Sequence, residues 1–119
     1  MPLNNTALNL MADALRGAAT YIALHSADPG TTGANPTTAA RVLASWPAAT
    51  GSGDLVITSK NFTGGAANGA VTWVGLWSAA TVGTFYGGFL IPTGGTNDLT
   101  FNAAGEYTLT NFTIDGSSV

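Results

Sequence analysis

The first amphipathic pattern in the chain predicts a helix. Leu8, Met11 and Leu15 are spaced three and then four residues apart, so they share one face of an α-helix. Asparagine and threonine side chains just before them can accept hydrogen bonds from the first free backbone N–H groups. Gly17 can adopt the left-handed conformation that ends many helices. We therefore predict a short helix over about residues 5–16.

After this helix the pattern changes to short runs of apolar, aromatic and β-branched residues between turn residues. Such runs occupy residues 20–25, 41–46, 55–58, 70–77, 84–91, 98–102 and 106–115. About seven short strands with frequent turns indicate a mainly β fold. We expect an antiparallel β-sandwich, jelly-roll-like, with one short N-terminal α-helix.

Two strands carry more specific patterns. In residues 70–77 both faces are largely apolar, which is typical of a central strand, and Gly75 leaves room there for a close ring or backbone contact. In the last strand the apolar positions change parity, from Tyr107 and Leu109 to Phe112 and Ile114. A bulge near Thr110 and Asn111 would bring all four onto one face.

The whole chain, residues 1–119, is predicted to be a single domain. The helix comes first, residues 20–25 and 41–115 form the sandwich, and residues 26–40 form a long exposed loop. A turn at Asp28, Pro29 and Gly30 opens this loop, because proline and glycine provide the backbone angles that a type II turn needs. Loops of this length are often functional.

Charge is scarce. Only 8% of residues are charged, against 45% hydrophobic, and the net charge is −3 with three Lys and Arg in all. A protein that faces water on all sides carries more charge, so we expect part of the surface to contact protein. The basic residues do not cluster, which excludes a nucleic-acid-binding role. There is no long apolar run and no signal-peptide pattern at the N-terminus, so we expect neither a membrane span nor a signal peptide.

Residues able to perform chemistry are few: the chain has no cysteine and one histidine. His25 and Asp28 have a spacing that some metal sites use, but no third ligand is evident. Ser26 follows His25 directly, and adjacent strand residues point to opposite faces, so they make a poor nucleophile–base pair. Asp98, Glu106 and Asp115 lie on neighbouring segments without any sign of a pocket. We expect no enzymatic activity, no cofactor and no metal.

Aromatic residues leave one further class of function open. An aromatic platform for sugar stacking could use any of Trp46, Trp73, Trp77, Tyr86 and Phe89. Core packing is the favoured role for Trp73 and Trp77, because a sandwich needs large inward side chains. Trp46 precedes a proline near a loop, and its exposure stays open. A carbohydrate-binding module is therefore an alternative.

Three groups of segments resemble a known family. The first is NTALNLMADAL at residues 5–15. The second covers residues 21–35, with LHSADPGTTGAN at 24–35 as its most specific part, followed by Ala40 and Arg41. The third combines VGLWSA at 74–79, GTFYGG at 83–88 and FNAAGEYTL at 101–109. This order resembles a family of small tailed-bacteriophage virion proteins, usually labelled minor tail or tail-fibre-like proteins.

The resemblance implies a non-enzymatic structural protein of the virion, repeated in the particle and assembled in the bacterial host cytoplasm. A capsid decoration protein on the head surface is the alternative place. Implied partners are other virion proteins and further copies of the chain, in a trimer or ring; a host surface glycan is a further possible partner. The candidate interface comprises His25, Asp28, Pro29, Asn35, Pro36, Arg41 and Trp46. Within it, an ion pair between Arg41 and Asp28 is expected across the loop.

Overall fold

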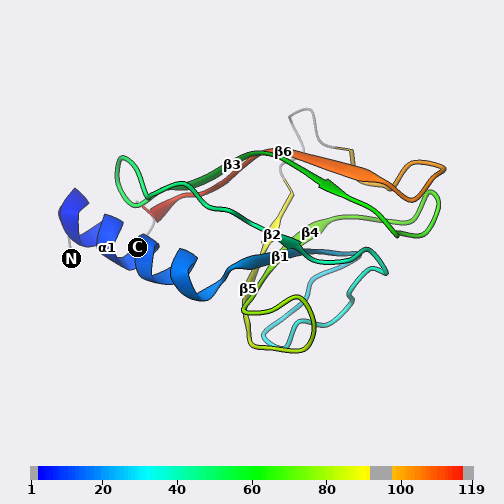
Figure 1. The fold of residues 1–119 in the computed structure, drawn as a ribbon, viewed down its shortest axis with the longest axis horizontal. Helices are drawn as coiled ribbons and strands as arrows, with labels where there is room; N and C mark the ends of the chain where they lie inside the picture. The colour runs from blue at the N-terminus through cyan, green and yellow to red at the C-terminus, as the bar shows by residue number, and fades with distance from the viewer. Residues whose placement is uncertain (1–2, 92–97, 117–119) are drawn as a thin grey trace.

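The computed structural model describes residues 3–91 and 98–116, and within them it contains one helix and two antiparallel sheets (Figure 1). The four-stranded sheet has the order β2-β1-β4-β5, and the second sheet pairs β3 with β6. The elements are α1 (Asn5–Ala18), β1 (Tyr21–His25), β2 (Val42–Leu43), β3 (Leu55–Phe62), β4 (Trp73–Trp77), β5 (Phe85–Leu90) and β6 (Tyr107–Ile114). The predicted mainly β sandwich with one helix is confirmed.

Helix α1 begins as its sequence predicts and ends later. The Asn4 side chain accepts a hydrogen bond from the Ala7 amide at 2.9 Å, which caps the first turn. Gly17 lies inside the helix, so its predicted role as the terminator is wrong. The last helical residue is Ala18, and the C-cap is Ala19, a fully buried residue whose amide donates to the Leu15 carbonyl at 2.7 Å. Burial of Ala19 fixes where the chain turns toward β1.

The core lies between the two sheets. Phe89 of β5 meets Phe112 of β6 edge to face, with ring centroids 6.0 Å apart, and so joins the sheets directly. Burying one large apolar side chain contributes about 1.5–3 kcal/mol, so this layer supplies much of the stability. Its fully buried members from the strands include Ile22, Leu24, Leu55, Phe62, Val74, Leu76, Leu109 and Phe112.

The parity change in β6 occurs without a bulge. Leu55 pairs with Ile114 at one end of the β3–β6 ladder and Phe62 with Tyr107 at the other, and both strands have eight residues. No residue has been inserted. The change occurs at Asn111, whose φ of 53° is left-handed and turns the following side chains back to the core. The shared core face was predicted correctly, and the bulge was not.

Several strands are shorter than their apolar runs. Of the expected strand over residues 41–46, only Val42–Leu43 pairs with β1. The run over residues 98–102 forms no strand; Thr100 makes a single isolated bridge with Ala70. Backbone pairing, which sequence periodicity does not determine, sets these limits. Residues 92–97, which we placed in the sandwich, lie outside the described residues.

Candidate functional site

The loop over residues 26–40 folds back over the outer face of the four-stranded sheet. Its Pro29 is buried, and a side chain added at Gly88 of β5 would meet the Pro29 ring at 2.4 Å. A Cβ atom added at Gly33 would likewise lie 2.4 Å from the indole of Trp77. The Ser26 amide donates to the Asn35 carbonyl at 2.9 Å and closes the loop. Much of this loop is therefore a cover for the sheet.

His25 lies under that cover and is 0% exposed. Its Nδ1 is 2.8 Å from the Ala34 carbonyl oxygen, and its Nε2 is 3.5 Å from the indole nitrogen of Trp77. The Phe85 ring meets it edge to face at 6.0 Å. Burial lowers the pKa of His25, and the nearby positive charge of Arg41 adds to that effect, against the opposing hydrogen bond to Ala34. His25 is thus a neutral structural residue, placed away from any surface contact.

Arg41 is held by backbone carbonyls and a ring. Its guanidinium donates to the carbonyls of Ala79 and Val82 at 2.8 and 2.7 Å. The same group lies 3.7 Å from the centroid of the Trp77 ring, a cation–π contact. Arg41 and Asp28, both within the described residues, form no ion pair, so that prediction is wrong. The carbonyls of the turn after β4 satisfy the guanidinium instead.

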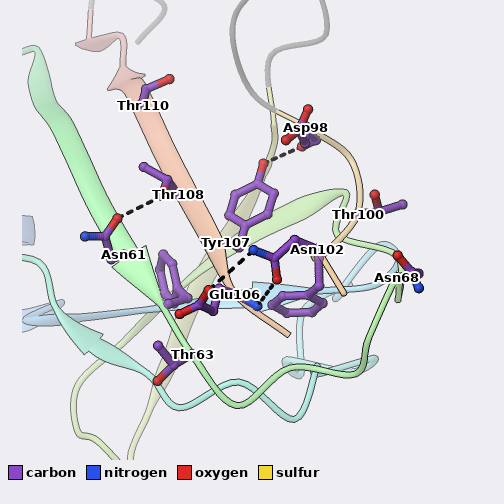
Figure 2. A pocket seen from close by; sticks show the side chains of 12 residues that line it. Asn61, Thr63, Asn68, Asp98, Thr100, Asn102, Glu106, Tyr107, Thr108 and Thr110 are labelled. Carbon is purple, nitrogen blue, oxygen red and sulfur yellow. Dashed lines mark hydrogen bonds between the residues drawn. The ribbon is translucent and has the colours of Figure 1, made fainter. Parts of the chain in front are cut away.

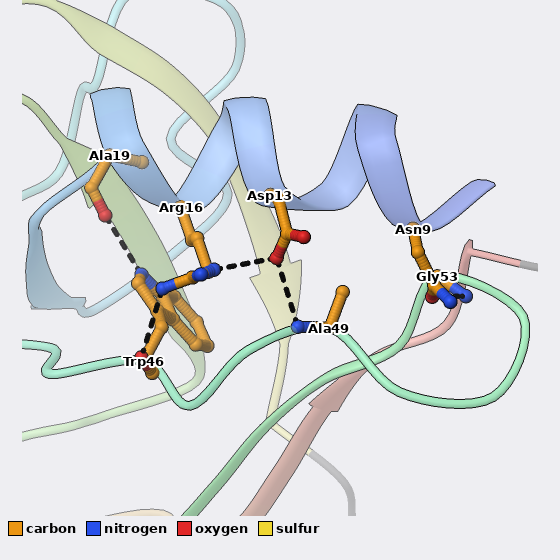
Figure 3. Close-up of polar contacts among 7 residues, drawn as sticks. All are labelled: Asn9, Asp13, Arg16, Ala19, Trp46, Ala49 and Gly53. Atoms are coloured by element: carbon orange, nitrogen blue, oxygen red, sulfur yellow. Dashed lines mark hydrogen bonds and ion pairs between the residues drawn. The ribbon is translucent and has the colours of Figure 1, made fainter. Parts of the chain in front are cut away.

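Trp46 is buried, at 8% exposed, and its indole nitrogen donates to the Ala19 carbonyl at 2.9 Å (Figure 3). The carboxylate of Asp13 fixes the neighbouring chain by accepting from the Ala49 amide at 3.0 Å. It also pairs with Arg16 at 2.7 Å. The amide of Ala49 and the side chain of Arg16 together lower the pKa of Asp13. Trp46 therefore connects the end of α1 to the segment around residues 46–49. Because its ring is buried, it offers no platform for a sugar.

The remaining candidate interface residues, Asp28, Asn35 and Pro36, are exposed residues of the same loop. The Asp28 carboxylate accepts a hydrogen bond from the backbone N–H of Gly30 at 2.8 Å. The side-chain amide of Asn35 donates to the backbone carbonyl of Asp28 at 2.9 Å. The seven candidates therefore separate into three surface residues and four that hold the fold. A contact through this loop stays a prediction for the exposed three.

A polar cleft of about 810 Å³ lies elsewhere, at the end of the β3–β6 sheet (Figure 2). Amides, hydroxyls and carboxylates make up most of its wall, and none of the described residues that line it is a lysine, arginine or histidine. Among these described residues an anionic ligand would find no counter-charge. The polar cleft is defined by the side chains of Asn61, Asn68, Asp98, Asn102, Glu106 and Thr108.

Hydrogen bonds fix the walls of the polar cleft. The Asn102 side-chain oxygen accepts from the amides of Ala104 and Glu106, each at 2.9 Å. Across the strands, the Thr108 hydroxyl donates to the side-chain oxygen of Asn61 at 2.8 Å. Such fixed amide and hydroxyl groups can bind a polyhydroxylated ligand, since each can donate or accept.

Tyr107 forms part of the floor of the polar cleft. Its hydroxyl donates to the Asp98 carbonyl at 2.5 Å, and burial with the negative charge of Asp98 raises the pKa of Tyr107 to about 12. It is therefore a fixed hydrogen-bond donor and a poor base at neutral pH. Sequence reasoning missed this site. Its signal in the sequence was the pair of carboxylates, Asp98 and Glu106, on neighbouring segments that the turn before β6 brings together.

Large apolar side chains are exposed on three elements: Leu10 and Met11 on α1, Leu43 on β2, and Tyr86 and Leu90 on β5. An apolar groove of about 410 Å³ also lies between α1 and the ends of β3, β5 and β6.

Within residues 3–91 and 98–116, no three histidine, cysteine or acidic residues come close enough to hold a metal ion. The one helix in those ranges lacks the length and apolar character needed to cross a bilayer.

Comparison of the chain with protein-family models, curated proteins and solved structures finds no match. The resemblance to tailed-phage virion proteins therefore stays a prediction from the quoted segments.

Proposed function

We propose that this chain is a non-enzymatic structural protein of a bacteriophage virion, a repeated minor tail or tail-fibre-like component. The resemblance of the quoted segments to small tailed-bacteriophage virion proteins indicates this class of protein. The structure supports a structural role because side chains able to perform chemistry are engaged in holding the fold: His25 beneath the loop and Arg41 over Trp77. Partners are other virion proteins and further copies of the chain, brought together in the bacterial cytoplasm.

The observation that carries the proposal is the character of the surface. Leu10 is 67% exposed and Leu90 63%, in a chain of which only 8% of residues are charged. Isolated exposed leucines are ordinary, but here they occur with few charges to keep copies apart. A subunit built into a particle buries such residues against neighbours.

Immunogold labelling of purified particles tests the proposal and its location. An antibody against the folded chain should label the tail of the phage that encodes it. Label spread over the head would support the alternative, a capsid decoration protein. Absence from gradient-purified particles, with the protein present in the lysate, would overturn both places.

The polar cleft favours one competing function, recognition of a host surface glycan. Its fixed amides and hydroxyls match the groups of a neutral sugar, whereas Trp46, the obvious aromatic candidate, is buried. A glycan array with the wild-type chain tests this function. Binding that Thr108→Val abolishes and Thr113→Val preserves would assign the polar cleft, because both threonines are exposed on β6 and only Thr108 lines the cleft. No binding to any glycan would remove this alternative.

A small hydrolase centred on His25 is the remaining competing class. The imidazole is fully buried and bonded at one nitrogen to the Ala34 carbonyl, which leaves no access for a substrate. Hydrolysis of ester or glycoside substrates that His25→Ala abolishes, in a variant that is still folded, would contradict the structural role.

A further inference from the structure

Residues 26–35 form a compact loop whose two ends meet at the end of β1; it is the light blue to cyan segment in Figure 1. The Ser26 amide donates to the Asn35 carbonyl at 2.9 Å, and the next residue, Pro36, makes an isolated bridge with His25. The chain therefore leaves the sheet and returns to it at nearly the same point. Loops of roughly 6–16 residues whose ends adjoin pack as units and are frequently functional. We call residues 26–35 the flap.

Two close apolar contacts hold the flap against the sheet. A Cβ atom added at Gly88 of β5 would lie 2.4 Å from the ring of Pro29 in the flap. One added at Gly33 of the flap would lie 2.4 Å from the Trp77 indole of β4. Glycine at both points lets the flap approach the sheet closely. Because these contacts carry no charge, pH acts on the flap only through its polar attachments.

One hydrogen bond attaches the interior of the flap to the sheet. Nδ1 of His25 donates to the Ala34 carbonyl at 2.8 Å. In the described part of the chain, the other hydrogen bonds of residues 27–34 stay within the flap; the amides of Gly33 and Ala34, for example, both donate to the Pro29 carbonyl. The imidazole is therefore the polar attachment on which the flap depends between its two ends.

That attachment requires a neutral imidazole. The indole N–H of Trp77 lies 3.5 Å from Nε2 of His25, so Nε2 accepts and Nδ1 carries the single proton of the ring. A second proton would make His25 a cation that is 0% exposed and faces an N–H donor. A buried charge without a partner is strongly unfavourable, whereas water hydrates the same charge once the flap has lifted. Acid therefore favours the lifted flap.

Among the described residues around His25, no carboxylate is placed to balance the added charge. Burial lowers the pKa of His25, and the nearby cation of Arg41 lowers it further, against the hydrogen bonds to the flap carbonyls. Asp28 of the flap is exposed, and its carboxylate bonds an amide within the flap. Tyr21 of β1 and Tyr86 of β5 bring no negative charge in acid, and β2 and β4 have no titratable residue.

We propose that the flap is an acid-released lid: protonation of His25 lifts residues 26–35 from the sheet while the rest of the fold stays intact. His25 is not part of the core between the sheets, because it points to the opposite face of β1 from Leu24. Lifting the flap uncovers Trp77 and Phe85, whose rings pack against each other and against His25. The lid goes beyond the proposed function and does not depend on it.

Hydrogen exchange of the full chain, followed by NMR from pH 7.5 to about 5 and corrected for the intrinsic effect of pH on exchange, tests the lid. The Gly33 and Ala34 amides should lose protection by up to about tenfold for each pH unit below 6.5, because an isolated turn is not stable away from the sheet. Low concentrations of urea should barely change their protection, since lifting the flap exposes little surface. The same urea should strongly reduce the protection of the β3 and β6 amides, which exchange through larger openings.

Three variants separate the hydrogen bond from the charge. His25→Phe cannot donate to the Ala34 carbonyl, so its flap should be about tenfold less protected at pH 7.5 and should not respond to pH. His25→Asn keeps an N–H donor near the position of Nδ1 and cannot titrate, so its flap should not respond to pH either. Asp28→Asn, in the flap itself, is the matched control and should respond to pH like the wild type. Protection of the β3 and β6 amides in the same spectra reports whether each variant is folded.

Flap protection in the wild type that stays constant from pH 7.5 to about 5 would overturn the proposal. Equal urea dependence of the flap and of β3 and β6 would also overturn it, because the flap would then open only when the whole chain unfolds. The same pH response in the wild type and His25→Phe would assign the response to another group and reject the lid. Detection of the protein on particles is a separate readout, so failure of the lid would leave the proposed function standing.

Discussion

The imidazole of His25 and the indole of Trp77 lie parallel, with 6° between their planes and 6.4 Å between their centroids. The indole N–H donates toward Nε2 at 3.5 Å, and the Ala34 carbonyl accepts from Nδ1 at 2.8 Å. Both contacts require the neutral imidazole with its proton on Nδ1, because a carbonyl only accepts and an indole N–H only donates. A second proton on the imidazole, at Nε2, would place an N–H donor opposite the N–H donor of the Trp77 indole.

Acid should therefore destabilise the fold through His25. Its pKa in the folded chain lies below the ordinary value of 6.5, so the unfolded chain takes up the proton first. Above pH 6.5 the stabilisation is complete. As pH falls below 6.5 it is lost, by about 1.4 kcal/mol per pH unit, until the lowered folded pKa is reached. Urea unfolding between pH 7.5 and about 5 measures this loss.

His25→Phe is the control for that titration. It keeps an aromatic ring beside Trp77 and removes the ionisable group, so its unfolding free energy should be flatter over the same window. Asp13, whose pKa is lowered from 3.8, titrates at more acid pH and does not interfere. Equal slopes for the wild type and His25→Phe would assign the acid sensitivity elsewhere.

Gly75 should resist replacement. A Cβ atom at Gly75 would lie 2.3 Å from Nε2 of His25 and 3.2 Å from the Phe85 ring, in the middle of β4. Gly75→Ala should therefore destabilise the fold by about 1–3 kcal/mol, the usual cost of overpacking. Gly17→Ala is the matched control: it has open space around it within α1 and should stabilise by about 0.5–1 kcal/mol. Urea midpoints that move together for both variants would contradict the packing described here.

Arg41 should matter for stability, and the charge of Asp28 should not. Arg41→Met removes two hydrogen bonds to backbone carbonyls and the contact with Trp77, so we expect a loss of about 1–3 kcal/mol. Asp28→Asn keeps an oxygen for the Gly30 amide and should change stability by less than about 0.5 kcal/mol. Thermal unfolding measures both variants. Rescue of Arg41→Asp by Asp28→Arg would show that the two residues pair after all.

Asn111 should tolerate glycine and reject branched residues. Its φ of 53° is left-handed, where a β-branched side chain is strained. Asn111→Val should cost about 1–2 kcal/mol, while Asn111→Gly should be near neutral. Because Asn111 is exposed, neither change alters core volume. Chemical denaturation compares them, and equal stability of the two variants would refute the conformational explanation.

Local patterns predicted the elements that depend on local chemistry. The apolar spacing in α1 and the alternation in β4 lead directly to a helix and a central strand, and Gly75 was identified as a point of close ring contact. The parity change in β6 correctly placed both pairs of apolar residues on the core side. These features depend on side-chain periodicity, which sequence displays.

Features that depend on long-range contact were missed. Arg41 carries no local sign that the carbonyls of Ala79 and Val82 lie beside it, so an ion pair with Asp28 was the natural expectation. The polar cleft forms only when the segment around Asp98 lies against β6. The three-residue separation of His25 and Asp28 likewise did not reveal that one is buried and the other exposed.

The central claim is that this chain is a repeated, non-enzymatic part of a particle. Quantitative mass spectrometry of gradient-purified virions, scaled to the major capsid protein, tests it most directly. Our account predicts several copies per particle at a constant ratio across preparations. A protein that stays in the soluble lysate while particles assemble without it would contradict the account.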